Sequence, residues 1–364
     1  MEPPVRAPGA RRPRGRGLRA NFGRPLSGIR VVDLTSLLPG GFATRLLADL
    51  GADVVKVEPP GGESGRRFPP VVDGLSVYYR LTASGKKVRF LDLKTPKGRA
   101  ALDGLLSKAD VLIHSLRPGA ARKLSLSESD VASRNPGLVQ VRIAGFRHSE
   151  KAAHDLNFLA SSGLLDLNRD ERGRPVVPGF QLPDVAGGAW PAVAAVLTGL
   201  LERARTGRVA ASTVSLHEGS LALLSFGAAE VLATGLAASE GALVTRELHP
   251  CYGLYPTKDG RLLAVACIES KFWSGWCAAL GLPDLVPLQY ASGAEGRRAR
   301  RRLAAATRRR TFAWWTRRLA SLDVCVTPVA TLTEAIEREI RREKGQGVFR
   351  RGRDGRHEIV PRIR

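Results

Sequence analysis

The sequence predicts an α/β protein with two unequal parts: a large domain built on an open parallel sheet, and a smaller α+β domain. Two strand–helix–strand units follow one another in the first 116 residues. A helix between two strands lets the second strand run parallel to the first, so this repeated unit predicts a parallel sheet. Beyond residue 250 the pattern changes to a hairpin followed by helices, which predicts a separate α+β unit.

The first unit covers residues 28–60. GIRVVDLT (28–35) is rich in β-branched residues and predicts a strand. GGFATRLLADLG (40–51) has helical periodicity and ends at a glycine, which commonly terminates helices. ADVVKVEPP (52–60) predicts a second strand, which its prolines end.

The second unit repeats this order. KVRFLDLK (87–94) and DVLIHSL (110–116) predict strands, and TPKGRAALDGLLSKA (95–109) predicts the helix between them. Thr95 is a suitable N-cap, and the proline after it suits the first helical position. LVQVRIAGF (138–146) predicts one further strand.

The second half of the chain is more helical. From Leu156 to Glu202 it is rich in Ala, Leu and Gly, and we expect mostly helix there. CYGLYPTKDGRLLAVACI alternates like a hairpin around Lys258-Asp259-Gly260. The elements expected after this hairpin are helices over 271–282 and 310–323, a strand over 324–330, and a helix from 331 that Thr331 caps.

These elements predict four segments. Residues 1–25 are rich in Arg, Pro and Gly and are expected to form a disordered basic tail. We assign residues 26–215 to the large α/β domain and residues 216–330 to the small α+β domain. Residues 331–364 are expected to return to the large domain.

Composition narrows the class of protein. The formal net charge is +23, yet neither basic block, the N-terminal tail or residues 297–310, carries interleaved aromatics or a known binding motif. We therefore do not expect a nucleic-acid partner, and we interpret residues 297–310 as a solvated helix face. There is no run of eighteen apolar residues, so no transmembrane helix is expected. Four cysteines without CxxC spacing favour reduced thiols over a disulfide or zinc site, and the cytoplasm is the default location.

Few residues stand out as chemical groups. There is no GxGxxG after the first strand, and GxxxxGK[ST], HExxH and GxSxG are all absent. His154 and Asp184 remain as candidates, with Glu269 after a buried-type strand. Each of these residues could equally be a helix cap or a first-turn acid. From pattern alone, the chain is an α/β enzyme with a candidate acid–base pair.

Longer motifs indicate a family. GIRVVDLT, FATRLLADLGADVVKVEPPGGESGR, LDLKTPKGRAAL and DVLIHSLRPGAARKL resemble the class III coenzyme A transferases. AAHDLNFLASSGLL, LPDVAGGAWPAVAAVLTGLLERARTGR and CYGLYPTKDGRLLAVACIESKFW resemble the α-methylacyl-CoA racemase branch of that family. These motifs occur in the same order from about Leu26 to about Lys344, which makes the resemblance specific.

The resemblance implies both architecture and reaction. It implies a Rossmann-like parallel sheet domain with a smaller domain, in two chains that thread through each other as interlocked rings. Each active site would then lie between the large domain of one chain and the small domain of the other. The implied activity is an isomerase that inverts the α-carbon of a 2-methylacyl-CoA or 2-arylpropionyl-CoA thioester. It needs no metal and no cofactor beyond the CoA of the substrate.

By the same resemblance, His154 and Asp184 are the two acid–base groups. Glu269 orients His154, and the main-chain N–H of Asp155 holds the thioester oxygen. The residues implied to bind CoA are Leu91, Asp92, Leu93 and Lys94 near the adenine, and Ser115, Leu116, Arg117 and Lys123 along the phosphates. For the two leucines, a place in the core is an equal alternative.

The chain departs from the family pattern at several positions. Ala153 replaces the usual Gly before the His, and Pro59 falls where a basic residue clasps the nucleotide. Val209 and Thr213 replace an expected Gly and Asp, and Met1 is the single methionine although the racemases have a Met-rich acyl surface. These changes affect substrate identity and CoA affinity more than reaction class.

Two alternatives remain at this point. The first is a CoA transferase with Asp184 as nucleophile, forming a mixed anhydride and then an aspartyl-CoA thioester. The transferases generally lack the His154 and Glu269 pair. The second is a non-catalytic basic binding protein, which the charge alone suggests and which salt-sensitive DNA retention would support.

Overall fold

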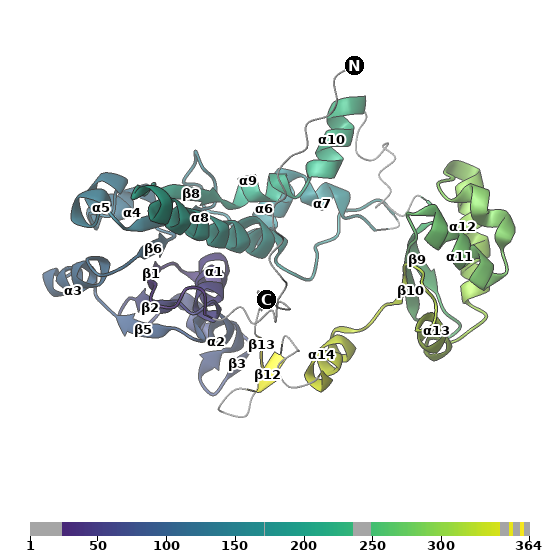
Figure 1. Ribbon diagram of the computed structural model, residues 1–364, viewed down its shortest axis with the longest axis horizontal. Coiled ribbons are helices and arrows are strands. Elements are labelled where there is room, and N and C mark those ends of the chain that lie inside the picture. Colours follow the sequence, from purple (N-terminus) through teal and green to yellow (C-terminus); the bar gives the residue numbers. More distant parts are fainter. Residues whose placement is uncertain (1–23, 171, 236–248, 343–348, 352–356, 360–364) are drawn as a thin grey trace, which may run out of the picture.

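The computed structural model describes residues 24–170, 172–235, 249–342, 349–351 and 357–359. It shows a large part built on a six-stranded sheet and, at the other end of the long axis, a small part built on a three-stranded sheet (Figure 1). The basic tail expected over residues 1–25 lies almost entirely outside the described residues.

The large sheet is parallel throughout, with strand order β5-β2-β1-β6-β7-β8. In the centre, Val31 pairs with Val54 on one side and with Val111 on the other. After β1 the chain adds β2 and β5 on one side of it, and from β6 it adds β7 and β8 on the other side. The direction in which strands are added therefore reverses between β1 and β6. The strands are β1 (Arg30–Leu34), β2 (Asp53–Glu58), β5 (Lys87–Phe90), β6 (Val111–His114), β7 (Val139–Ala144) and β8 (Ser212–Ser215).

Helices connect these strands and cover both faces of the sheet. Thr95 accepts a hydrogen bond from the Gly98 N–H and caps α3, and a proline occupies the first turn, as the sequence predicts. The helices before β8 are α1 (Leu37–Asp49), α2 (Val77–Ala83), α3 (Pro96–Leu106), α4 (Pro118–Lys123), α5 (Glu128–Arg134), α6 (Asp155–Ser162), α7 (Leu164–Leu167) and α8 (Trp190–Thr206). Short elements complete this region: η1 (Ser64–Arg67), β3 (Val71–Val72), β4 (Leu75–Ser76) and the π-helical turn η2 (Pro183–Ala189).

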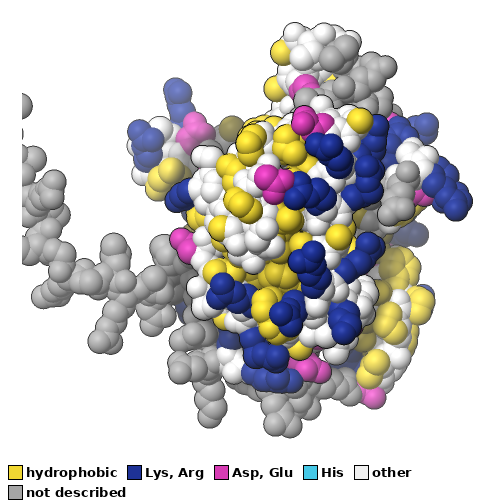
Figure 2. Space-filling model, turned by 90° about the vertical axis from the view of Figure 1, so that its right-hand side faces the viewer, with side chains coloured by type: hydrophobic (Ala, Val, Ile, Leu, Met, Phe, Trp, Pro, Cys, Tyr) yellow, Lys and Arg dark blue, Asp and Glu magenta, His cyan; other side chains and the backbone are white. Residues whose placement is uncertain are grey.

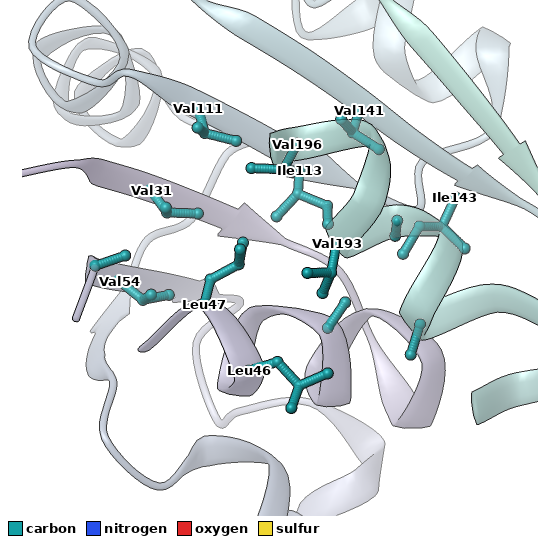
Figure 3. Packing of buried hydrophobic residues seen from close by; sticks show 14 of the residues in the cluster. Val31, Leu46, Leu47, Val54, Val111, Ile113, Val141, Ile143, Val193 and Val196 are labelled. Atoms are coloured by element: carbon teal, nitrogen blue, oxygen red, sulfur yellow. The ribbon is translucent and has the colours of Figure 1, made fainter. Parts of the chain in front are cut away.

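The main core lies between the sheet and helices α1 and α8 (Figure 3). Leu46 and Leu47 of α1 and Val193 and Val196 of α8 pack on the central strands, and all four are almost fully buried. Each such side chain contributes about 1.5–3 kcal/mol of burial free energy. A second cluster, with Leu102 and other residues of α3 and α5, covers the opposite face.

The small part is an antiparallel sheet packed on helices. Its strands are β9 (Tyr252–Pro256), β10 (Leu262–Ala266) and β11 (Val326–Pro328), in the order β11-β10-β9. Its helices are α11 (Ser270–Leu280), η4 (Pro283–Leu288), α12 (Gly293–Thr307) and α13 (Phe312–Leu319). Trp273, Trp276 and Trp315 fill the core between them. The hairpin expected around residues 258–260 is the β9–β10 turn.

Helix α12 carries most of the second basic block. Ala299 and Leu303 face the core, whereas Arg297, Arg298 and Arg301 are exposed, as expected for a solvated helix face. Figure 2 looks onto this end of the molecule and shows Lys and Arg side chains distributed among apolar ones.

Five further elements lie outside the two sheets and their main helices. Helix α9 (Leu216–Ala222) packs on η2 and α6, and α10 (Ser225–Thr234) projects from the large part (Figure 1). Helix α14 (Leu332–Arg341) is drawn between the two parts, and Thr331 caps it as expected. The strands β12 (Phe349–Arg351) and β13 (His357–Ile359) pair with each other.

One expectation needs correction. The mostly helical interpretation of 156–202 is wrong for residues 168–170 and 172–181, which are not helical: Gly173 has φ 74° and two prolines interrupt the pattern. Among the described residues, one helical stretch, Pro183–Thr206, is long and apolar enough to cross a membrane by length and composition alone, a test that core helices also pass. Its inner face packs on the sheet through Ala192, Val193 and Val196.

Candidate active site

A cleft opens where the strand order reverses, beyond the carboxyl ends of β1, β6 and β7. It has a volume of about 230 Å³. Its walls include Ser36 after β1, Ser115 to Arg117 after β6, and Arg142 at the end of β7. Open α/β sheets commonly bind ligands at this switch point, because the loops diverge there and leave a crevice.

His154 and Asp184 both line this cleft. They are thirty residues apart in sequence and reach the cleft from different helices, α6 and η2, which pack against each other. The structure therefore places both residues of the pair that the sequence predicts in the lining of a single cleft.

His154 lies at the N-terminus of α6, in extended conformation. Its main-chain N–H donates to the Asn157 side-chain oxygen at 2.9 Å, so the start of the helix is fixed. His154 is an exposed residue, and it lines the cleft. The His154 ring is therefore placed where a ligand in the cleft can reach it.

Asp184 lies in the π-helical turn that leads into α8. It is half-buried, and its main-chain N–H donates to Asp155 Oδ1 at 2.9 Å. Burial, and after it the negative charge of Asp155, raise the pKa of the Asp184 carboxyl from 3.8 to about 7. At neutral pH this carboxyl is therefore present in both protonated and ionised forms, as an acid–base catalyst requires.

Two glycines set the path of the turn that carries Asp184. A Cβ on Gly188 would lie 2.3 Å from the Leu216 side chain. A Cβ on Gly219 would lie 1.9 Å from the carbonyl oxygen of Gly187. Turn η2 and helix α9 thus approach each other more closely than side chains would allow, and this contact places Asp184.

Asp155 is the first residue of α6. Its main-chain N–H belongs to the first turn, where helical N–H groups have no intrahelical acceptor. The carboxylate is half-buried, and burial raises its pKa while the hydrogen bond from Asp184 lowers it. Asp155 does not itself line the cleft, but it follows His154 in the chain and its carboxylate is bonded to the main chain of Asp184, and both of those residues line it.

A second cleft adjoins the first. Its volume is about 220 Å³, and it is lined by Leu91, Asp92, Leu93 and Lys94. Ser36 and Leu116 line both clefts, so the two spaces meet along the sheet edge. Leu91 and Leu93 also pack against the second core cluster, so both leucines line the cleft and contribute to the core.

Two predicted residues lie away from these clefts. Lys123, at the exposed C-terminal end of α4, lines neither of them. Glu269 is the exposed N-cap residue of α11 in the small part, whereas His154 starts α6 in the large part (Figure 1). Within one chain, Glu269 is therefore apart from His154.

The structure also adds residues that the sequence analysis missed. Ser36, Arg142 and Lys151 line the cleft beside His154 and Asp184. Arg142 was detectable as a charged residue in the otherwise apolar strand VQVRIA. Ser36 and Lys151 lie in connecting segments and have no signal of their own in the pattern.

Buried charges support the floor of the second cleft. Lys56 contacts Glu63 at 3.0 Å, and Arg66 donates to Glu58 at 2.6 Å. Burial opposes ionisation of the nearby Asp33, but the positive charges of Lys86 and Lys56 and two hydroxyl hydrogen bonds lower its pKa to about 2. These pairs hold the loop after β2 in place.

Fold and cleft together define an α/β protein in which an imidazole and a carboxyl group line one cleft at the switch point of the sheet. The chain belongs to the CoA-transferase family III, whose model matches residues 26–361. The resemblance found in the sequence is thereby confirmed.

Individual relatives include both reaction types. The chain is 33% identical to human alpha-methylacyl-CoA racemase over 325 residues, which cover 88% of this chain and 81% of the relative. It is 34% identical to mouse succinyl-CoA:glutarate CoA-transferase over 301 residues, which cover 78% and 68%. The crystal structure of Rv3272 from Mycobacterium tuberculosis matches with a TM-score of 0.78 at 27% identity, covering 93% of this chain and 92% of that one. Family membership is thus compatible with either reaction.

Proposed function

We propose that the protein is an isomerase that inverts the α-carbon of a 2-methylacyl-CoA or 2-arylpropionyl-CoA thioester. The observation that carries this proposal is that His154 and Asp184 line one cleft at the switch point of the sheet. A thioester bound there would have its α-carbon between an imidazole and a carboxyl group.

The chemistry follows from these two groups. Neutral His154 takes the α-proton from one face, and the electron pair of the broken C–H bond moves into the thioester as an enolate. The protonated carboxyl of Asp184 then delivers its proton to the opposite face of the same carbon. The reverse direction exchanges the roles of the two groups, and no other reactant is consumed.

The enolate needs a hydrogen-bond donor at its oxygen. In the proposal this donor is the main-chain N–H of Asp155, which is unused at the start of α6. The pantetheine arm follows Ser115 to Arg117, and the adenine lies against Leu91 to Lys94 in the adjoining cleft. The positive charge of Arg117, with Lys123 further along α4, attracts the phosphates.

We further propose that a second copy of the chain completes the site. Glu269 of the same chain lies in the small part, so in this proposal Glu269 of the partner subunit orients the imidazole of His154. Helix α10 supports a second copy, because Phe226 is 88% and Leu232 is 85% exposed. Large apolar side chains at such exposure commonly mark a surface that another protein covers.

A CoA transferase is the second candidate, because transferases match the chain at similar identity. There the ionised Asp184 would attack the acyl-CoA, release CoA thiolate and form an anhydride. The raised pKa of Asp184 lowers the fraction of this nucleophile at neutral pH, which favours the isomerase.

One assay separates the two reactions. Wild-type protein is incubated in deuterated water with a single enantiomer of 2-methylacyl-CoA, with and without an added carboxylic acid. The proposal predicts deuterium at the α-carbon and loss of optical rotation, with the CoA remaining on its original acyl group. Transfer of CoA to the added acid without deuterium uptake would instead establish the transferase.

A further inference from the structure

The side chain of Asp155 connects the two elements that carry the acid–base pair. As the first residue of α6, it follows His154 directly. Its Oδ1 accepts the main-chain N–H of Asp184 at 2.9 Å, at the start of η2. The Asp155 carboxylate therefore links two N-termini. One is that of α6, beside which His154 lies, and the other is that of η2, which carries Asp184.

We propose that the Asp155 carboxylate is a positioning residue that fixes Asp184 opposite His154 and holds a negative charge beside it. This inference rests on the proposed isomerase function, and it adds a side-chain role to the main-chain N–H role already assigned to Asp155. The acid–base pair must be held across one carbon atom, and a displacement of about 1 Å can cost a hundredfold in rate.

The hydrogen bond accounts for the positioning. Turn η2 begins with a proline, and its early N–H groups have no intrahelical acceptors. Asp155 satisfies the N–H of Asp184 itself, so the residue that carries the reacting carboxyl is the one that is tied. The bond is partly buried, and loss of its acceptor would leave an N–H without a partner.

The negative charge of Asp155 contributes to keeping the Asp184 carboxyl protonated. Burial raises the pKa of Asp184 first, and the Asp155 carboxylate raises it further, to about 7. Other charged groups lie on the helices that pack on η2. Helix α9 carries His217 and Glu218, and Glu218 is paired with Arg147. Helix α1 carries Arg45 and Asp49, which pair with each other. The charged groups of α8 are Glu202, Arg203 and Arg205, near its C-terminal end, and the cleft wall adds Arg117, Arg142, Glu150, Lys151 and His154.

Asp155→Asn and Asp155→Ala separate the two effects. Asparagine keeps the acceptor oxygen and removes the charge, whereas alanine removes both. Asp166→Asn is the matched control, because Asp166 is exposed, pairs with Arg169 and lies outside the cleft lining. Asp184 itself is followed by carbon-13 NMR of protein labelled at the aspartate carboxyl carbon, with its signal assigned from Asp184→Asn. This titration requires no substrate and no activity.

The expected results differ between the variants. In Asp155→Asn the Asp184 carboxyl titrates at lower pH than in wild type, and the corresponding limb of the pH–rate profile for deuterium exchange moves the same way. In Asp155→Ala the exchange rate also falls about tenfold or more below that of Asp155→Asn, because the positioning is lost. Asp166→Asn leaves the titration and the profile unchanged.

An unchanged Asp184 titration in Asp155→Asn would overturn the charge role. Equal exchange rates in the Asn and Ala variants would overturn the positioning role. Absence of exchange in the wild type would instead refute the proposed function, and the NMR titration would still decide the effect of Asp155 on Asp184.

Discussion

Replacing Asp184 by Asn should stabilise the folded protein at neutral pH. The pKa of this carboxyl is raised from 3.8 to about 7, mainly because burial disfavours the ionised form. The folded state therefore binds the proton more tightly than the unfolded state between these two values, and the free energy of unfolding falls as pH rises through this window. The asparagine side chain does not titrate in this range, so the unfolding free energy of the variant does not fall as the pH rises from about 4 to about 7.

The size of the effect follows from the pKa difference. A rise from 3.8 to about 7, at about 1.4 kcal/mol per pKa unit, sets an upper limit of about 4 kcal/mol. Because Asp184 is partly exposed to the cleft, solvent screens part of this destabilisation. We therefore expect the unfolding free energy of Asp184→Asn to exceed that of wild type by about 1–3 kcal/mol at pH 8. At pH 4 the two proteins should be about equal in stability.

Urea unfolding at pH 4, 5, 6, 7 and 8 tests this, with equal protein concentration throughout because the proposed dimer makes stability concentration-dependent. The quantity to follow is the difference in unfolding free energy between Asp184→Asn and wild type. Asp166→Asn serves as the control for loss of one exposed carboxylate and should show no such trend. A difference that stays constant from pH 4 to pH 8, or that favours wild type at pH 8, would refute the reasoning.

Three further outcomes are expected. Gly219→Ala should lower the free energy of unfolding by about 1–3 kcal/mol in urea unfolding, since the new methyl would lie 1.9 Å from the Gly187 carbonyl oxygen. Arg117→Ala should raise the KM for the acyl-CoA about tenfold at nearly constant kcat, because it removes the proposed phosphate contact and no reacting group. Phe226→Asp with Leu232→Asp should shift the sedimentation of micromolar protein from the proposed dimer towards monomer, whereas an unchanged coefficient would remove α10 from the proposed interface.

The sheet was predictable because its signal is local. The strands around Val31, Val111 and Val141 are short apolar runs, and a helix between consecutive strands leaves the chain few ways to close a sheet. Strand β8 was missed because STVS has a polar composition, and its partners along β7 become apparent only after folding. The non-helical residues 172–181 were missed because Ala- and Leu-rich regions on both sides obscured the prolines among them.

The site was only partly predictable. His154 and Asp184 could be named from motifs, but their meeting depends on the close contact between η2 and α9 at Gly187 and Gly219, which no periodicity reveals. The bond between Asp155 and Asp184 joins residues 29 positions apart and has no pattern in sequence. Glu269 shows the converse: a motif can name a residue that one folded chain does not bring to the cleft.

The central claim is that His154 and Asp184 act on opposite faces of one carbon atom. Its most direct test measures deuterium exchange from each pure enantiomer of 2-methylacyl-CoA, using wild type, His154→Ala and Asp184→Asn. We predict that wild type exchanges both enantiomers, that His154→Ala loses mainly one of them, and that Asp184→Asn loses mainly the other. If both variants lose the same enantiomer, or if His154→Ala exchanges both at the wild-type rate, the two-face account is wrong.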